Sequence, residues 1–196
     1  ESNFWSIEND LNTEFKISQL PADNYVDLGS LSSIGDIDGD GLNDLFINSN
    51  RDESFYLIKG NFIEQNKGSN IYFDDLDDGQ YSQLYSNNQN LSSSIISNIG
   101  DFNGDKIDDI GIISNSYSYI LSGSFLSENN ENSINLDLLQ SNQALLLNEN
   151  IEKISNIGDL NGDGFDDLFI NKENSYQDPF ILFGKPLKNT IKYSVS

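Results

Sequence analysis

A loop rich in aspartate and glycine occurs three times in this sequence, and its residue types and spacing suggest cation chemistry. The copies begin at Asp36, Asp101 and Asp159. Each has Asp or Asn at loop positions 1, 3 and 5, Gly at position 4 and Asp at position 9. A motif that recurs at intervals of about 60 residues indicates repeated supersecondary units.

Oxygen atoms at alternate positions of a tight loop can converge on one hard cation. Calcium accepts roughly six to eight oxygen ligands, whereas magnesium keeps several waters and suits such a loop less well. We therefore predict about three Ca²⁺ ions, one in each repeat. The predicted side-chain ligands are Asp36, Asp38, Asp40 and Asp44; Asp101, Asn103, Asp105 and Asp109; and Asp159, Asn161, Asp163 and Asp167, with the main-chain carbonyls of Leu42, Ile107 and Phe165 completing the three shells.

An EF-hand loop begins in the same way but requires a glutamate at position 12 and flanking helices. Position 12 is occupied here by Ile47, Ile112 and Ile170, each within an apolar, β-rich run typical of a buried strand. The sequence thus predicts strand, calcium loop and strand. A single Asp- and Gly-rich segment is equally typical of a solvated turn, and the common register of three copies favours calcium.

The middle loop differs at position 6, where Lys106 replaces the glycine present as Gly41 and Gly164. Glycine tolerates a positive φ angle, which is unfavourable for lysine. Lysine also brings a positive charge near the site. We expect the middle loop to bind calcium most weakly.

Short strands are expected around each loop. A second apolar strand follows the loop strand and ends at Gly60, Gly123 or Gly184. Amphipathic segments at 71–76 and 134–138 are the expected fourth strands, and 15–20 resembles the same element of a preceding unit. Only 140–148 shows a possible helical period. Four short strands per unit match one blade of a propeller.

The loop core Gly-Asp-x-Asn/Asp-Gly-Asp-x-x-Asp/Asn-Asp, the apolar strand after it and the final Phe183-Gly184-Lys185-Pro186 resemble the FG-GAP repeat of integrin α-chain β-propellers and their bacterial relatives. The resemblance implies four-stranded blades with calcium in a hairpin loop of each. The Phe-Gly pair occurs only at Phe183-Gly184, and the Gly-Ala-Pro element is replaced, which weakens any analogy to integrin ligand recognition.

The expected fold is therefore all-β, with three four-stranded antiparallel blades at approximately 1–60, 61–123 and 124–196 in a single domain. Propellers close with about 4–8 blades. Three blades predict a partial propeller, completed by further blades from the same or another chain, or an open array capped by its ends.

Composition narrows the function classes. Thirty-two acidic and 10 basic residues give a net charge of −22, which argues against a nucleic-acid partner. The absence of cysteine and histidine removes thiolate chemistry and the commonest general base. The sequence contains no apolar run of about 18 residues, so no membrane-spanning helix is expected.

We expect a non-enzymatic, calcium-stabilised module for adhesion or scaffolding, extracellular or at a cell surface, with a protein or glycan ligand. One alternative is a lectin-like propeller. A glycosidase or lyase on this scaffold is another, since paired carboxylates are abundant. The acidic run at 74–78 is interpreted as a solvated turn, and the sequon at Asn90 has meaning only in a secreted eukaryotic protein. The aromatic residues considered for stacking sugars are Trp5, Tyr72, Tyr81, Tyr85, Tyr117, Tyr119 and Tyr176.

Overall fold

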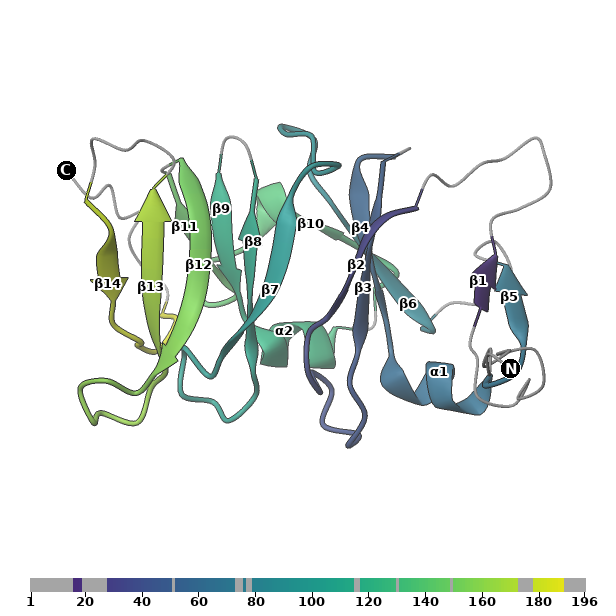
Figure 1. Ribbon diagram of the computed structural model, residues 1–196, viewed down its shortest axis with the longest axis horizontal. Helices are drawn as coiled ribbons and strands as arrows, with labels where there is room; N and C mark the ends of the chain where they lie inside the picture. The colour runs from purple at the N-terminus through teal and green to yellow at the C-terminus, as the bar shows by residue number, and fades with distance from the viewer. Residues whose placement is uncertain are drawn as a thin grey trace, which may run out of the picture.

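The computed structural model describes residues 16–18, 28–50, 52–72, 76, 79–114, 117–129, 131–148, 150–172 and 178–188. Three sheets of antiparallel strands stand side by side along the long axis of the molecule (Figure 1). The expected all-β class is confirmed. In the described ranges these sheets close neither a barrel nor a propeller.

Each sheet is built around one of the three aspartate loops. The first contains β2 (Leu28–Ser33), β3 (Leu45–Ser49), β4 (Ser54–Ile58) and β6 (Tyr81–Tyr85), with β10 (Ser133–Asn135) parallel to β6. The second contains β7 (Ile95–Gly100), β8 (Asp109–Ile113), β9 (Ser118–Leu121) and β11 (Ala144–Leu147). The third contains β12 (Ile151–Gly158), β13 (Asp167–Lys172) and β14 (Phe180–Leu182).

The expected fourth strands were placed wrongly. The fourth strand of the first sheet is β6, and that of the second is β11. The segment at 134–138 instead supplies β10 to the preceding sheet and then turns into the 3₁₀ helix η3 (Leu136–Leu138), because the Asn135 side chain accepts a hydrogen bond from the Asp137 amide. The segment at 71–76 contributes β5 (Asn70–Tyr72), which pairs in parallel with β1 (Lys16–Ser18).

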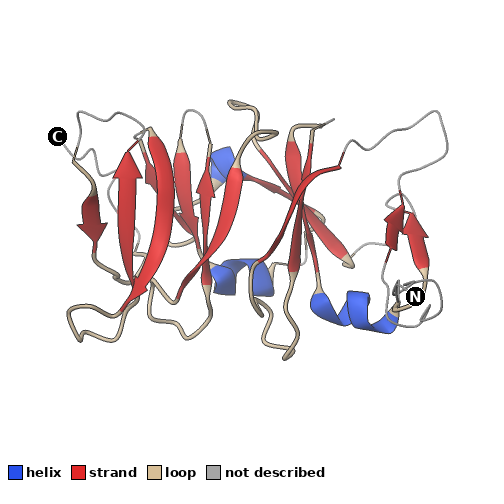
Figure 2. Cartoon of the chain, viewed as in Figure 1, coloured by secondary structure: helices blue, strands red, loops and turns tan. Residues whose placement is uncertain are grey.

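The helical content also differs from expectation. The run at 140–148 forms the strand β11, whose Ala144 and Leu145 are buried against β9. Two six-residue helices, α1 (Gly60–Gln65) and α2 (Gly123–Glu128), follow β4 and β9 and lie near the aspartate loops (Figure 2). A helix of this length is too short to produce an amphipathic period.

Apolar side chains fill the spaces between consecutive sheets. The two faces of a sheet contribute to different clusters, as the neighbours Phe46 and Ile47 on β3 do. Phe46 and Phe55 pack edge to face in the core between the first two sheets, with ring centroids 6.1 Å apart. Each sheet therefore needs its neighbour to bury a full face.

No helix in the described parts of the chain is long and apolar enough to cross a membrane. Trp5, Tyr176 and the acidic side chains of Asp74, Asp75, Asp77 and Asp78 lie outside the described residues.

Candidate metal centre

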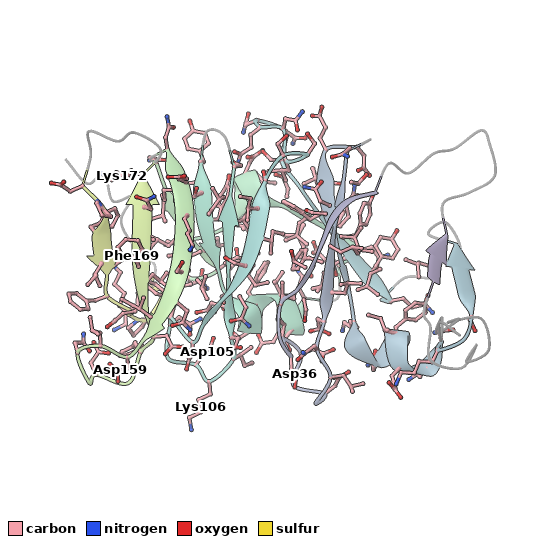
Figure 3. The ribbon with its side chains drawn as sticks, in the orientation of Figure 1. Asp36, Asp105, Lys106, Asp159, Phe169 and Lys172 are labelled. Atoms are coloured by element: carbon pink, nitrogen blue, oxygen red, sulfur yellow. The ribbon has the colours of Figure 1, made fainter. Side chains whose placement is uncertain are left out.

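The three aspartate loops join the first two strands of each sheet and project from the same edge of the molecule. Figure 3 shows Asp36, Asp105 and Asp159 along this edge. The three loops begin after β2, β7 and β12 and end at β3, β8 and β13. The strand, loop, strand order predicted from the sequence is confirmed.

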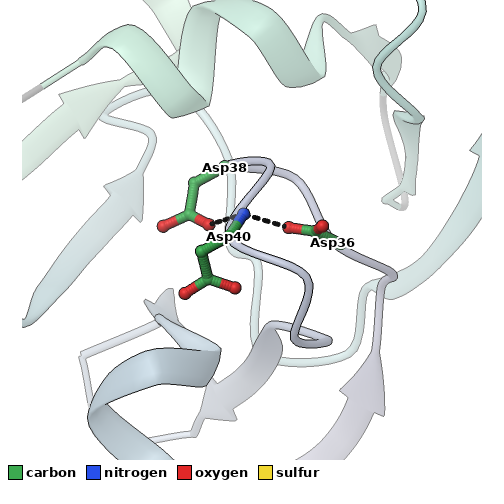
Figure 4. Close-up of side chains that lie close together, drawn as sticks. All are labelled: Asp36, Asp38 and Asp40. Atoms are coloured by element: carbon green, nitrogen blue, oxygen red, sulfur yellow. Dashed lines mark hydrogen bonds between the residues drawn. The ribbon is translucent and has the colours of Figure 1, made fainter.

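The first loop brings three carboxylates together. One oxygen from each of Asp36, Asp38 and Asp40 lies within 4.8 Å of the others (Figure 4). The Asp40 amide donates to Asp36 Oδ1 at 3.0 Å and to Asp38 Oδ1 at 3.2 Å, and the Gly41 amide donates to Asp36 Oδ2 at 2.8 Å. These bonds orient the carboxylates inward and leave lone pairs that a cation can use.

The other two loops repeat this hydrogen-bond pattern. Asp101 Oδ1 accepts from the Asp105 amide at 2.9 Å, and Asp159 Oδ1 accepts from the Asp163 amide at 3.0 Å. An asparagine stands at position 3 of each, so these loops present amide oxygens in place of one carboxylate. Within the described ranges, the first loop holds the only cluster of three acidic residues close enough to share an ion.

The main-chain carbonyls predicted as ligands belong to Leu42, Ile107 and Phe165. Their amides donate to the fifth-position carboxylates, at 2.8, 2.9 and 3.0 Å respectively. Position 7 therefore lies beside the fifth-position aspartate in each loop, and the ligand role of its carbonyl stays a prediction.

The ninth-position aspartates are buried and bind the protein backbone. Asp44 Oδ2 accepts from the Ile37 amide at 2.9 Å, and Asp44 Oδ1 accepts from the Gly60 amide at 2.8 Å. Asp167 repeats this arrangement with the amides of Leu160 and Gly184, both at 2.9 Å.

Asp109 makes similar contacts in the middle loop, except that the loop amide belongs to position 3 and not to position 2. Its Oδ2 accepts from the Asn103 amide at 3.0 Å, and its Oδ1 accepts from the Gly123 amide at 3.0 Å and from Asn103 Nδ2 at 2.8 Å. In all three sheets one carboxylate thus joins the loop to the end of the third strand. This role adds to the predicted metal-ligand role of position 9, which was the only one visible in the sequence.

We call Gly60, Gly123 and Gly184 the closing glycines. A Cβ atom on Gly60 would lie 2.7 Å from the Asn43 carbonyl oxygen, and one on Gly184 would lie 2.5 Å from the Asp166 carbonyl oxygen. At Gly123 the Asp108 carbonyl oxygen is closer still. Their place at the end of each second apolar run was the sequence signal for this contact, but spacing alone did not reveal its partner.

Burial shifts the ionisation of two ninth-position carboxyls. Desolvation raises the pKa of Asp44 to about 6, with further contributions from the charges of Asp38 and Asp40, and the amide hydrogen bonds oppose the shift. Desolvation also raises the pKa of Asp109 to about 7, again opposed by amide hydrogen bonds. A nearby divalent cation would favour the ionised form of both groups.

Two cationic side chains lie near the loops in different ways. Lys106 adopts a φ of 75°, as the missing glycine led us to expect, but its side chain extends away from the loop (Figure 3). Its effect on the middle loop is therefore mainly one of backbone strain. Lys59 was not identified from the sequence, and its Nζ lies 3.8 Å from Asp38 Oδ2.

Of the aromatic residues considered for sugar stacking, Tyr117 and Tyr119 line one cavity, and Tyr81 is not among its lining residues. Tyr81 packs against Tyr56, with ring centroids 5.9 Å apart, and Tyr119 is buried with its hydroxyl accepting from Gln89 Nε2. Tyr117 is exposed and lines a cavity of about 910 Å³ together with Asp137.

Comparison with known proteins does not assign the chain to a family. No protein-family model matches it, and neither curated proteins nor solved structures gave a significant match. Function must therefore be inferred from the internal repetition of the loops.

The closing glycines provide a first prediction. Gly123→Ala should lower the free energy of unfolding by about 2–3 kcal/mol, because the added methyl group displaces the Asp108 carbonyl and weakens the bond to Asp109. Gly39→Ala is the matched control, because a Cβ at that position would have nothing within 4 Å and only the positive φ is penalised, at about 1 kcal/mol. Urea denaturation measures both. Equal losses would contradict the steric role of the closing glycine.

The raised pKa values of Asp44 and Asp109 predict pH-dependent stability in chelator. The ordinary pKa of both is 3.8. Folding therefore favours the protonated forms, and the associated stability is complete below about pH 4 and is lost as pH rises through 6 and 7. The Tm should fall by several degrees between pH 5 and 7.5, and calcium should reduce the fall. Asp109→Asn should flatten the profile. A Tm that stays constant or rises over this interval in chelator would refute the assignment.

Proposed function

We propose that this protein is a non-enzymatic, calcium-stabilised scaffold of β-propeller type that acts outside the cell or at its surface, in adhesion or protein interaction. The observation that carries the proposal is the convergence of the Asp36, Asp38 and Asp40 carboxylates within 4.8 Å, in a loop whose hydrogen bonds recur in two further sheets. Extended sheets in series provide an interaction surface, and the loops provide control of their stability.

The donor set fits calcium. All the candidate ligands are oxygen atoms of carboxylates, amides or the main chain, which are the donors that hard cations prefer. The loop backbone is already shaped by amide-to-carboxylate hydrogen bonds, so binding requires little reorganisation. In the first loop Lys59 partly balances the negative charge, and an ion would have to compete with it.

A bound ion would stabilise the fold by reducing the repulsion between the loop carboxylates. Clustered carboxylates repel one another, and three Ca²⁺ ions would change the formal charge from −22 to −16. Binding only to the folded chain stabilises it by about 2.7 kcal/mol per site when calcium exceeds the dissociation constant a hundredfold. Extracellular modules bind calcium at about 0.1–1 mM, and sites of that affinity would be filled outside a cell and mostly empty inside it.

The FG-GAP-like sequence pattern supports the propeller part of the proposal. Three sheets stand in series, two of them with four strands joined in the order expected for blades, with β10 added at the edge of the first. Further blades, from this polypeptide or another one, would be needed for closure.

Carbohydrate binding is the second candidate function. The cavity beside Tyr117 combines an exposed aromatic side chain with Asp137 and Lys185, a set of groups that can stack on and hydrogen-bond to a sugar. A glycan-array screen with the full chain, and with Tyr117→Ala as the control, separates this role from a purely structural one.

Calcium should raise the Tm of the full chain in a saturable manner, and magnesium should do so much less. Asp36→Asn and Asp159→Asn should each reduce the calcium-dependent rise in Tm. Calorimetry should show that Asp101→Asn removes the least binding free energy, because the middle loop carries the positive charge of Lys106 at position 6. Lys106→Gly should raise the free energy of unfolding in chelator by about 1 kcal/mol, because the strained φ is present without an ion, and should tighten the site only through the loss of this charge. The ranking would be refuted if Asp101→Asn caused the largest loss. No response of Tm to calcium would refute the calcium proposal itself.

A further inference from the structure

The outer face of the third sheet exposes apolar residues whose counterparts in the other sheets are buried. Ile157 precedes the third loop and is 37% exposed, whereas the equivalent Ile34 and Ile99 are both 0% exposed. Leu160, at loop position 2, is 61% exposed, whereas Ile37 and Phe102 at the same position are 1% and 0% exposed.

The same difference extends along the face. Ile181 on β14 is 42% exposed, but its counterparts, Leu57 on β4 and Ile120 on β9, are 4% and 0% exposed. Phe169 on β13 is partly exposed, and its counterpart Phe46 is buried. The third sheet stands at one end of the row of sheets (Figure 1), and Figure 3 labels Phe169 on it.

Each buried counterpart is covered by the next sheet along the chain. Ile34, Ile37, Phe46 and Leu57 belong to the cluster shared by the first and second sheets. Ile99, Phe102 and Ile120 belong to the cluster shared by the second and third. The covering sheet supplies branched residues such as Ile154 and Ile170. At both internal interfaces the same face of one sheet is therefore covered by the next sheet along the chain, with equivalent residues in contact.

Hydrogen bonds that involve the loop backbone fix this register. The Asp166 amide of the third repeat donates to the Asp101 carbonyl at 2.9 Å, and the Asp101 amide donates to Asp166 Oδ2 at 3.1 Å. The Lys185 amide donates to the Phe102 carbonyl at 2.8 Å. At the preceding interface, Asn98 Nδ2 donates to the Ile34 carbonyl at 2.6 Å.

The space around the glycine before each loop differs between the covered sheets and the third sheet. A Cβ on Gly35 would lie 2.6 Å from Asn98 Nδ2, and one on Gly100 would collide with Asp166 Oδ2. A Cβ on Gly158 would have nothing within 4 Å. The third repeat thus has the glycine, the apolar positions and the carbonyl groups of the interface, and no sheet in the described parts of the chain covers them.

We propose that the outer face of the third sheet, formed by Ile157, Gly158, Leu160, Phe169 and Ile181, is a docking surface for a fourth repeat of the same kind. At both internal interfaces the residue at loop position 8 is an aspartate, Asp108 or Asp166. By repetition of these interfaces, the fourth repeat must place an aspartate at loop position 8 beside Asp159 and an asparagine side chain against Gly158. It must also cover the apolar residues with a sheet rich in branched side chains.

A second copy of this chain is not the occupant. To dock, it would have to present the covering face of its first sheet, whose Ile47 and Ile58 are already buried. Ser33 and Asn43 also replace the Asn and Asp pair that forms the internal contacts. The occupant is therefore a repeat in a different polypeptide or chain segment, with the Asn-Ile-Gly-Asp and Asp-Asp pattern of the second and third loops.

This inference rests on the proposed scaffold role only in naming the partner, and its test does not require calcium binding. Residues 124–184 are inserted a second time after Gly184, so that the junction repeats the native step from Gly123 to Ser124. The native chain contains no cysteine, so one introduced thiol reports exposure cleanly. Leu160→Cys is made in the original chain, in the first copy of the extended chain and, separately, in the inserted copy.

Maleimide labelling is measured with calcium and with chelator. We expect the first-copy thiol of the extended chain to react at least about tenfold more slowly than the same thiol in the original chain. The inserted-copy thiol, now at the new end of the row, should react at the original rate. The proposal would be overturned if the first-copy thiol and the inserted-copy thiol of the extended chain reacted at equal rates. An inserted repeat that does not fold would leave the first-copy thiol unprotected and would count as the same result.

Three further outcomes bear on the proposal. Gly158→Ala in the first copy should lower the Tm of the extended chain by about 5 °C more than the same change lowers the Tm of the original chain. The reason is that the new methyl group collides only with a docked repeat. If the Leu160→Cys thiol of the original chain becomes more protected as protein concentration rises, the face belongs to a second copy and the proposal is overturned. If calcium fails to stabilise the chain but labelling is protected in chelator, the calcium proposal fails and the docking surface stands.

Discussion

The buried carboxylate at loop position 9 is the contact on which the arrangement of each sheet depends. Asp44, Asp109 and Asp167 each accept one amide hydrogen from their own loop and one from a closing glycine. A buried carboxylate is costly unless it is hydrogen-bonded, and these amides offset part of the desolvation that raises the pKa of Asp44 and Asp109. Because the closing glycine comes so near position 8, no larger residue fits there. These contacts join each loop to its sheet through protein groups alone.

This constraint explains why the chain tolerates so much negative charge at one edge. The carboxylates at positions 1 and 5 of the loops, and at position 3 of the first loop, accept hydrogen bonds from loop amides. Backbone hydrogen bonds accordingly hold the pKa of Asp159 below its usual value. Two environments thus exist within one loop. Under the proposed function the outer carboxylates would receive a cation, while the inner one joins the loop to the fold, which would couple binding to stability.

The sequence alone was sufficient for the loops, the strands on either side of them and the all-β class, because these depend on local spacing and on runs of branched residues. It was insufficient for the fourth strands. Local alternation of apolar and polar residues does not determine which strands pair over long sequence separations. It therefore could not place β6 and β11 as fourth strands, or β10 at the edge of β6. The second role of Asp44 was hidden for the same reason, since Gly60 is distant in sequence and only the fold brings them together. The strain at Lys106 was visible because it is local; the nearby charge of Lys59 was not.

The most direct test of this account is amide hydrogen exchange at Gly60, Gly123 and Gly184, followed by NMR in chelator. If the buried carboxylates hold the loops without metal, these three amides should exchange as slowly as those in the middle of β8, although they lie outside the strand ladders. The Gly41 amide, bonded to the exposed carboxylate of Asp36, should exchange much faster. Exchange of the three closing-glycine amides at the rate of Gly41 would show that the contact forms only with an ion bound, and it would contradict the account.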